Sequence, residues 1–125
     1  MILYILQNAY KSDKHQFTNK KEWGRELLRS HSGRRLQEMI PEGAEFKIIN
    51  ASNNVGTHSA SSFKADLKHM AKLINKIKPD IICACGKIAQ AGCKELGVKF
   101  VSAPHPAWRQ LSKKITSDIR MQLNG

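Results

Sequence analysis

Four short apolar runs stand out along a chain that otherwise mixes polar and apolar residues, and each run has the length of a β-strand. β-Branched, aromatic and other apolar side chains dominate these runs, as is typical of strands. The first and third are almost continuously apolar, which is expected of strands buried on both faces of a parallel sheet. The predicted strands are Ile2–Leu6, Phe46–Ile49, Asp80–Cys85 and Val98–Ser102.

Helical patterns separate the predicted strands. Asn19–Glu22 has the spacing of a capping box and is followed by apolar residues that share one helical face. We expect His31–Gly33 to end this helix, because glycine is favoured just past a helix terminus. A shorter helical piece follows at Arg34–Ile40 and ends at Pro41.

Three more helices are predicted in the second half of the chain. The longest has Ser61 or Ser62 as its cap, an apolar face with helical spacing, and Pro79 as its end. The next lies within Gly86–Gly97, and the last repeats apolar residues at every fourth position over Leu111–Leu123.

Strands and helices therefore alternate along the whole chain. Such alternation indicates a parallel sheet with helices on both faces, joined by right-handed crossovers. The predicted fold is α/β: a three-layer α/β/α sandwich around a four-stranded parallel sheet. A length of 125 residues suits a single domain over residues 1–125.

Charge suggests the kind of partner. Lysine and arginine number 21 and aspartate and glutamate 10, so 21 − 10 gives a formal net charge of +11. An excess of this size favours a polyanion, most simply nucleic acid, although a basic surface can also serve solubility alone. No apolar run reaches the roughly 18 residues of a membrane span, so we expect no membrane partner. The three clustered cysteines fit a reducing compartment and buried structural thiols.

The predicted strands all run into polar residues. Ligands of open α/β sheets bind beyond the carboxyl ends of the strands, so these exits are the candidate site. Asparagine at an exit also favours turns, and that alternative stays open for each amide taken alone. The exits contain Gln7, Asn8, Asn50, Gly86, Lys87 and His105.

His105 is held between Pro104 and Pro106, which restrict the backbone on both sides and so orient the imidazole. A rigid loop histidine without a role is the alternative. The exits carry no carboxylate, which disfavours a two-carboxylate hydrolase and a magnesium-dependent phosphoryl transferase. No phosphate-binding loop or dinucleotide fingerprint occurs, and the cysteines lack the spacing of a metal site. We therefore expect neither a cofactor nor a metal.

Four segments resemble motifs of the uracil-DNA glycosylase superfamily, in the same order along the chain. LQNAYK (6–11) is similar to the water-activating motif GQDPYH, and IINAS (48–52) to the LLLNA segment. APHPAWRQL (103–111) is similar to the HPSPLS motif, and PDIICACGKIAQ (79–90) to a strand-glycine-helix segment of that superfamily. The fold of the family is the sandwich that periodicity predicts.

The resemblance implies catalytic and base-binding roles. Asn50 would bond the Watson–Crick edge of a flipped base, and His105 would donate to the carbonyl oxygen where negative charge grows. Gln7 and Asn8 would line the pocket and hold water, Tyr10 would exclude thymine, and Phe17 would stack on the base. Asn8 stands where the best-studied branch carries aspartate. An amide cannot take a proton, so general-base help is lost.

The segment after His105 departs from the family motif, because HPSPLS becomes HPAWRQ and the usual leucine wedge is displaced. Trp108, Arg109 or Leu111 could enter DNA in its place. We expect Arg109, Lys113 and Lys114 to contact phosphates, because they follow the His105 loop directly. The lysines repeated between positions 64 and 76 are interpreted instead as a solvated helix face.

The sequence therefore predicts a monofunctional DNA glycosylase that hydrolyses the N-glycosidic bond of uracil or a related modified base after base flipping. The alternative is a non-catalytic DNA-binding relative with the same fold. An interaction module for other proteins has no positive sequence feature. The expected partner is DNA, the expected state is a monomer, and the expected location is cytoplasmic and nucleoid-associated, in a bacterium or a virus-infected host.

Overall fold

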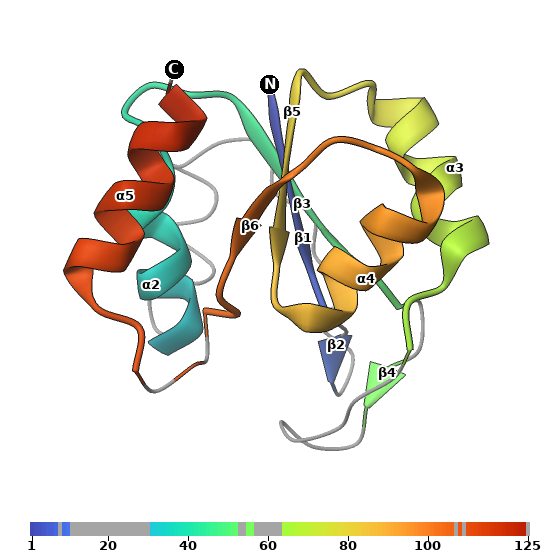
Figure 1. Cartoon of the computed structure of the whole chain (residues 1–125), viewed down its shortest axis with the longest axis horizontal. Helices are drawn as coiled ribbons and strands as arrows, with labels where there is room; N and C mark the ends of the chain where they lie inside the picture. Colours follow the sequence, from blue (N-terminus) through green and yellow to red (C-terminus); the bar gives the residue numbers. More distant parts are fainter. Residues whose placement is uncertain are drawn as a thin grey trace.

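A computed structural model of the chain describes residues 1–7, 9–10, 31–52, 55–56, 64–106, 108 and 110–124. A four-stranded sheet with strand order β3-β1-β5-β6 lies at the centre, and every pair of neighbouring strands is parallel (Figure 1). The strands are β1 (Ile2–Leu6), β3 (Phe46–Asn50), β5 (Ile81–Cys85) and β6 (Val101–Ala103). The predicted four-stranded parallel sheet is confirmed.

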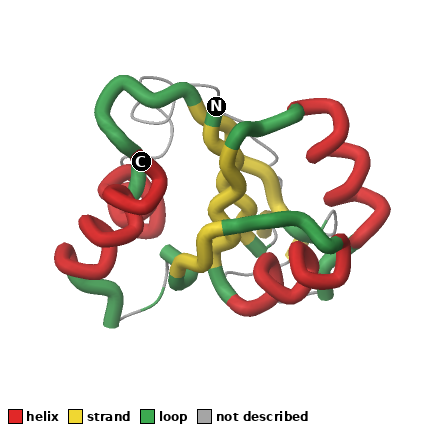
Figure 2. Tube along the Cα trace, turned by 45° about the horizontal axis from the view of Figure 1, so that its top comes forward, coloured by secondary structure: helices red, strands yellow, loops and turns green. Residues whose placement is uncertain are grey.

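Helices cover both faces of the sheet. Helices α2 (His31–Glu38) and α5 (Lys113–Asn124) lie on one face. Helices α3 (Leu67–Ile77) and α4 (Lys87–Leu96) lie on the other, with the strands between the two pairs (Figure 2). The predicted three-layer sandwich is therefore confirmed.

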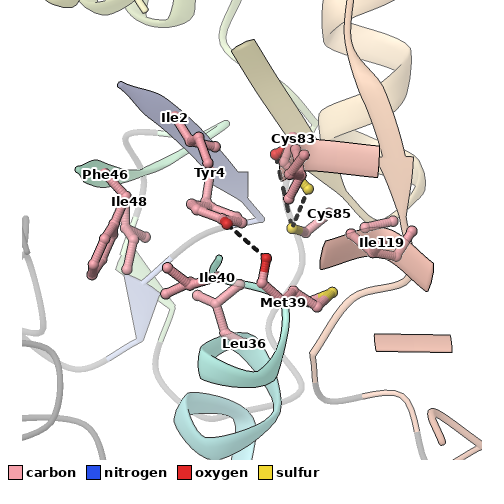
Figure 3. Packing of buried hydrophobic residues seen from close by; sticks show 12 residues of the cluster. Ile2, Tyr4, Leu36, Met39, Ile40, Phe46, Ile48, Cys83, Cys85 and Ile119 are labelled. Carbon is pink, nitrogen blue, oxygen red and sulfur yellow. Dashed lines mark hydrogen bonds between the residues drawn. The ribbon is translucent and has the colours of Figure 1, made fainter. Parts of the chain in front are cut away.

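Alternation along β1 divides the core into two clusters. Ile2 and Tyr4 pack toward α2 and α5, and Leu3 and Ile5 pack toward α3 and α4. The Tyr4 hydroxyl donates to the main-chain carbonyl of Met39 at 2.8 Å, as Figure 3 shows. This bond ties the segment after α2 to the centre of the sheet, and burial raises the pKa of the Tyr4 phenol.

The predicted buried thiols are confirmed. Cys83, Cys85 and Cys93 are all free and buried. Cys83 and Cys85 share one face of β5, with their sulfur atoms 3.9 Å apart (Figure 3). Burial raises the pKa of the Cys93 thiol to about 11, so it remains protonated and unreactive at neutral pH. Within the described residues, no group of three histidine, cysteine or acidic side chains could hold a metal ion.

Several predicted helix boundaries are wrong. His31–Gly33 does not end a helix but forms the first turn of α2. Helix α3 begins at Leu67 rather than after Ser61 or Ser62, because the Asp66 carboxylate accepts the His69 main-chain N–H at 3.1 Å and caps it there. Ser61, Ser62 and the capping box at 19–22 lie outside the described residues.

Two short strands that the apolar pattern did not predict lie beyond the main sheet. Strand β2 (Ala9–Tyr10) pairs in parallel with β4 (Val55–Gly56) beyond the ends of β1 and β3 (Figure 1). The pair therefore lies at the carboxyl edge of the sheet. Among the described helices, none is long and apolar enough to cross a membrane.

Candidate functional site

Strand register brings distant segments of the chain to one edge of the sheet. Leu6 pairs with Asn50, and Cys85 pairs with Ala103, at the ends of four parallel strands. Because parallel strands end at the same edge, the exits of β1, β3, β5 and β6 meet there. This is the lower edge of the sheet in Figure 1, where the β2–β4 pair also lies. The candidate site predicted from the strand exits is thus a single region of the fold.

The Asn50 side of this edge is fixed by main-chain hydrogen bonds. The ladder between β1 and β3 continues past the strands, because Ser52 N–H donates to the Gln7 carbonyl at 2.9 Å. Asp66 N–H donates to the Ala51 carbonyl at 2.8 Å and connects the exit of β3 to the start of α3. Asn50 and Gln7 are both half-buried, and side-chain alternation places Asn50 on the same face of β3 as Ile48.

The His105 side is fixed by close contact with the end of β5. Gly86 N–H donates to the Ala103 carbonyl at 2.8 Å, which joins the exits of β5 and β6. A Cβ atom added to Gly86 would lie 3.2 Å from the Cβ atom of His105. His105 therefore lies against the exit of β5, and its approach depends on the missing side chain at position 86.

The environment of His105 keeps its imidazole neutral. Burial lowers the pKa of His105 below its ordinary value of 6.5, because the charged form loses solvation. A neutral imidazole has one N–H donor and one acceptor nitrogen. His105 also lines a pocket of about 620 Å³ together with the first turn of α4, β6 and Trp108. At neutral pH it can therefore donate a hydrogen bond without carrying a charge.

The loop after His105 turns tightly back onto the protein. Trp108 N–H donates to the His105 carbonyl at 2.9 Å, and Leu111 N–H donates to the Trp108 carbonyl at 3.2 Å. The Arg35 guanidinium, from α2, donates to the same Trp108 carbonyl at 3.3 Å. These bonds fix the main chain at Trp108, and the residue itself is 43% exposed.

Leu111 does not have the exposure that a DNA wedge needs. Its side chain is only 2% exposed, so it packs in the interior. Its position in the four-residue apolar repeat already pointed inward, although it precedes α5 rather than belonging to it. The expectation that Leu111 enters DNA is therefore corrected, and in the described part of this loop Trp108 is an exposed apolar side chain.

Two predicted phosphate contacts lie in the first turn of α5. Lys113 and Lys114 are both exposed, and the Ser112 hydroxyl accepts the Ile115 N–H at 3.3 Å to cap the helix. The first turn of α5 contains no acidic residue. Positive charge at a helix N-terminus opposes the helix dipole, so these lysines do not stabilise α5 electrostatically.

Several predicted site residues cannot be placed. Asn8, Phe17 and Arg109 lie outside the described residues. Tyr10 belongs to β2 by its backbone, but the structure does not describe its side chain. The structure therefore brings Gln7, Asn50, His105 and Trp108 to the carboxyl edge of the sheet and leaves the other predicted base-binding residues unplaced.

Two residues of this region were not predicted as site residues. Gln90 donates from its side-chain amide to the Ala103 carbonyl at 2.9 Å, and Arg35 donates to the Trp108 carbonyl. Gln90 belongs to the GKIAQ segment of the resemblance, so its motif was a usable signal. Arg35 had no such signal, because its side chain binds a main-chain atom that any residue could supply.

Asn50 and His105 lie on opposite sides of the β1 exit. His105 lies at the exit of β5, Asn50 ends β3, and β1 runs between them. Neighbouring strands lie about 4.8 Å apart, so the two exits are separated by about 10 Å. The Asn50 side chain offers an amide donor and acceptor, and His105 offers a neutral donor. Each group can bond a polar atom of a heterocycle, although Asn50 does not line the pocket that contains His105.

The family model of the uracil DNA glycosylase superfamily matches residues 7–123. The match spans β3, β5 and β6 and every described helix except the last residue of α5, and it begins directly after β1. No curated protein and no solved structure matches the chain.

Proposed function

Because the chain belongs to the uracil-DNA glycosylase superfamily, whose members generally hydrolyse glycosidic bonds, we propose that it is a monofunctional DNA glycosylase. The substrate would be uracil or a related modified base in DNA. The base must leave the duplex before reaction, because its glycosidic bond is inaccessible in a stacked helix. Hydrolysis would release the free base and leave an abasic sugar.

The position of His105 is the observation that carries this proposal. Its imidazole is partly buried, neutral and held against Gly86 at the carboxyl edge of the sheet. When a glycosidic bond to a pyrimidine breaks, negative charge develops on the departing base and its carbonyl oxygen. A fixed donor at that oxygen stabilises the transition state more than the ground state, and one such donor contributes about 2.7–4 kcal/mol.

We assign base recognition to the opposite side of the site. Asn50 would bond the Watson–Crick edge of the base, because its amide both donates and accepts. Gln7 lies between the two sides, at the exit of β1, and would form the floor of the pocket together with Asn8. Tyr10 and Phe17 keep the roles that the family resemblance implies, exclusion of thymine and stacking.

We assign DNA contact to the surface that follows His105. Trp108 is exposed, and three hydrogen bonds fix its main chain, one of them from the Arg35 side chain, so its ring can serve as a wedge that enters the base stack. Lys113 and Lys114 lie a few residues further on. They oppose the dipole of α5 and so have a better electrostatic use in binding phosphate. Arg109 would join them.

Base release from modified oligonucleotides tests the proposal. Single-turnover reactions should use single- and double-stranded DNA containing deoxyuridine, deoxyinosine or a modified pyrimidine. We expect His105→Ala to slow base release by about 10²–10³-fold. His69→Ala is the matched control, because His69 is a partly buried histidine on α3 and makes no part of the proposed site. If the wild-type protein releases no base from any of these substrates, the proposed activity is wrong.

A non-catalytic DNA-binding relative is the second candidate, and Asn8 favours it. The amide at this position cannot act as a general base toward water. This candidate predicts salt-dependent DNA binding that survives His105→Ala without base release from the wild type. Measuring binding and base release on the same oligonucleotides separates the two candidates.

A further inference from the structure

The side chain of Gln90 connects the ends of two strands. Its amide nitrogen donates to the Ala103 carbonyl at 2.9 Å and approaches the Ala84 carbonyl at 3.4 Å. Ala84 belongs to β5 and Ala103 ends β6, while Gln90 itself lies in the first half of α4. One side chain therefore bridges a helix and two strand ends, immediately before the His105 loop.

The end of β6 needs such support. It is a three-residue strand at the edge of the sheet, and in the described structure it pairs with β5 alone. A short edge strand has few main-chain hydrogen bonds to hold it in register. His105 comes two residues after this strand, so movement of Ala103 is transmitted to the imidazole through Pro104, whose ring restricts the backbone between them.

The Ala103 carbonyl is the point at which the supports converge. It accepts both the Gly86 N–H at 2.8 Å and the Gln90 amide at 2.9 Å. The first bond extends the strand ladder and is available to any residue with a main-chain N–H. The second depends on the side chain at position 90, because it needs an N–H donor at the length of glutamine.

We propose that Gln90 is a positioning residue for His105. Its amide holds the ends of β5 and β6 together and thereby keeps the imidazole partly buried against Gly86. The consequence for base release rests on the proposed glycosylase function, whereas the consequence for the position of His105 does not. Gln90 contacts main-chain carbonyls of the fold and acts on the reaction through His105.

Two substitutions of Gln90 test this role. Gln90→Met keeps the length of the side chain and removes the donor. Gln90→Asn keeps an amide but is one methylene shorter, so it cannot span to Ala103, and it provides a second variant if the first does not fold. Gln122→Met is the control, because Gln122 is an exposed glutamine on α5. Thermal unfolding confirms that each variant is folded at the temperature of measurement.

The decisive measurement is the titration of His105 by NMR in the DNA-free protein, with His105→Asn identifying its signals. Lys87, which lines the same pocket, and Arg35 of α2, which binds the loop after His105, are the same in every variant. A change in titration therefore reports on burial and position. We expect both Gln90 variants to raise the pKa of His105 toward its ordinary value, and Gln122→Met to leave it unchanged.

Base release gives the second measurement. At saturating DNA, we expect the single-turnover rate to fall about tenfold in the Gln90 variants while affinity for undamaged DNA stays within about twofold. If His105 titrates as in the wild type in a folded Gln90 variant, the positioning role is wrong. If the wild type releases no base, the glycosylase proposal fails, and the titration still decides the role of Gln90.

Discussion

Replacing Gly86 by alanine should disturb the candidate site through a single added methyl group. Gly86 joins β5 to α4 with φ +93° and ψ 168°. This backbone conformation is almost confined to glycine, because a Cβ atom collides with the neighbouring main chain. The added Cβ would also lie 3.2 Å from the Cβ and 3.6 Å from the Cδ2 of His105.

The size of the effect follows from these two contacts. Backbone strain in this region costs on the order of 1–3 kcal/mol, so the free energy of unfolding should fall by about that amount. Ordinary contacts of a Cβ atom lie at 3.4–4 Å, so His105 must move by a few tenths of an ångström. A displacement of 1 Å can cost about 10²-fold in rate, and this smaller shift should slow base release roughly threefold to tenfold.

Gly97→Ala is the matched control, and single-turnover base release is the assay. Gly97 also has a positive φ, +71°, but a Cβ atom added there would have no neighbour within 4 Å. We expect Gly97→Ala to lose stability in urea while keeping the wild-type rate of base release. Equal rates for the two variants, at a temperature where both are folded, would refute the inference that Gly86 sets the approach of His105.

Three further predictions concern His105 and the core. Because the folded-state pKa of His105 is lowered, its contribution to stability is present above the unfolded value of 6.5 and is lost as pH falls below it; in urea titrations the wild type should therefore lose more stability than His105→Asn on acidification. Tyr4→Phe removes the donor to the Met39 carbonyl and should lower the free energy of unfolding by about 1–3 kcal/mol. Gly92→Ala would place a Cβ atom 2.6 Å from the Met70 sulfur; overpacking should outweigh a helix-propensity gain of about 1 kcal/mol, and a higher melting temperature would contradict this.

The sheet was predictable because its strands are short apolar runs flanked by polar residues. Ile2–Leu6 matches β1 in full, and the third run differs from β5 by one residue. The predicted strand Val98–Ser102 begins too early, because Val98 N–H donates to the Cys93 carbonyl and completes the end of α4. Apolar character marks a residue as buried but does not distinguish a strand from the wrapped end of a helix.

The location of the candidate site was predictable, because it follows from the residues at which the strands end. Asn50 and His105 follow apolar runs, so their common edge could be inferred from the sequence alone. The hydrogen bonds of Gln90 and Arg35 could not be inferred from the sequence. Each side chain binds a main-chain carbonyl, and any residue can supply that carbonyl. Leu111 shows the opposite case, in which helical periodicity predicted burial better than alignment with a family motif did.

Main-chain contacts place both Asn50 and His105. This explains how the family match extends over nearly the whole chain although its motifs have diverged. Asn50 is placed by the ladder between β1 and β3, and His105 by the Ala103 carbonyl and the absence of a side chain at Gly86. Main-chain hydrogen bonds tolerate changes in the side chains around them. A motif can therefore change from HPSPLS to HPAWRQ while the histidine keeps its position. The residues that cannot change freely are those that place the main chain around His105, and Gly86 and Gln90 are two of them.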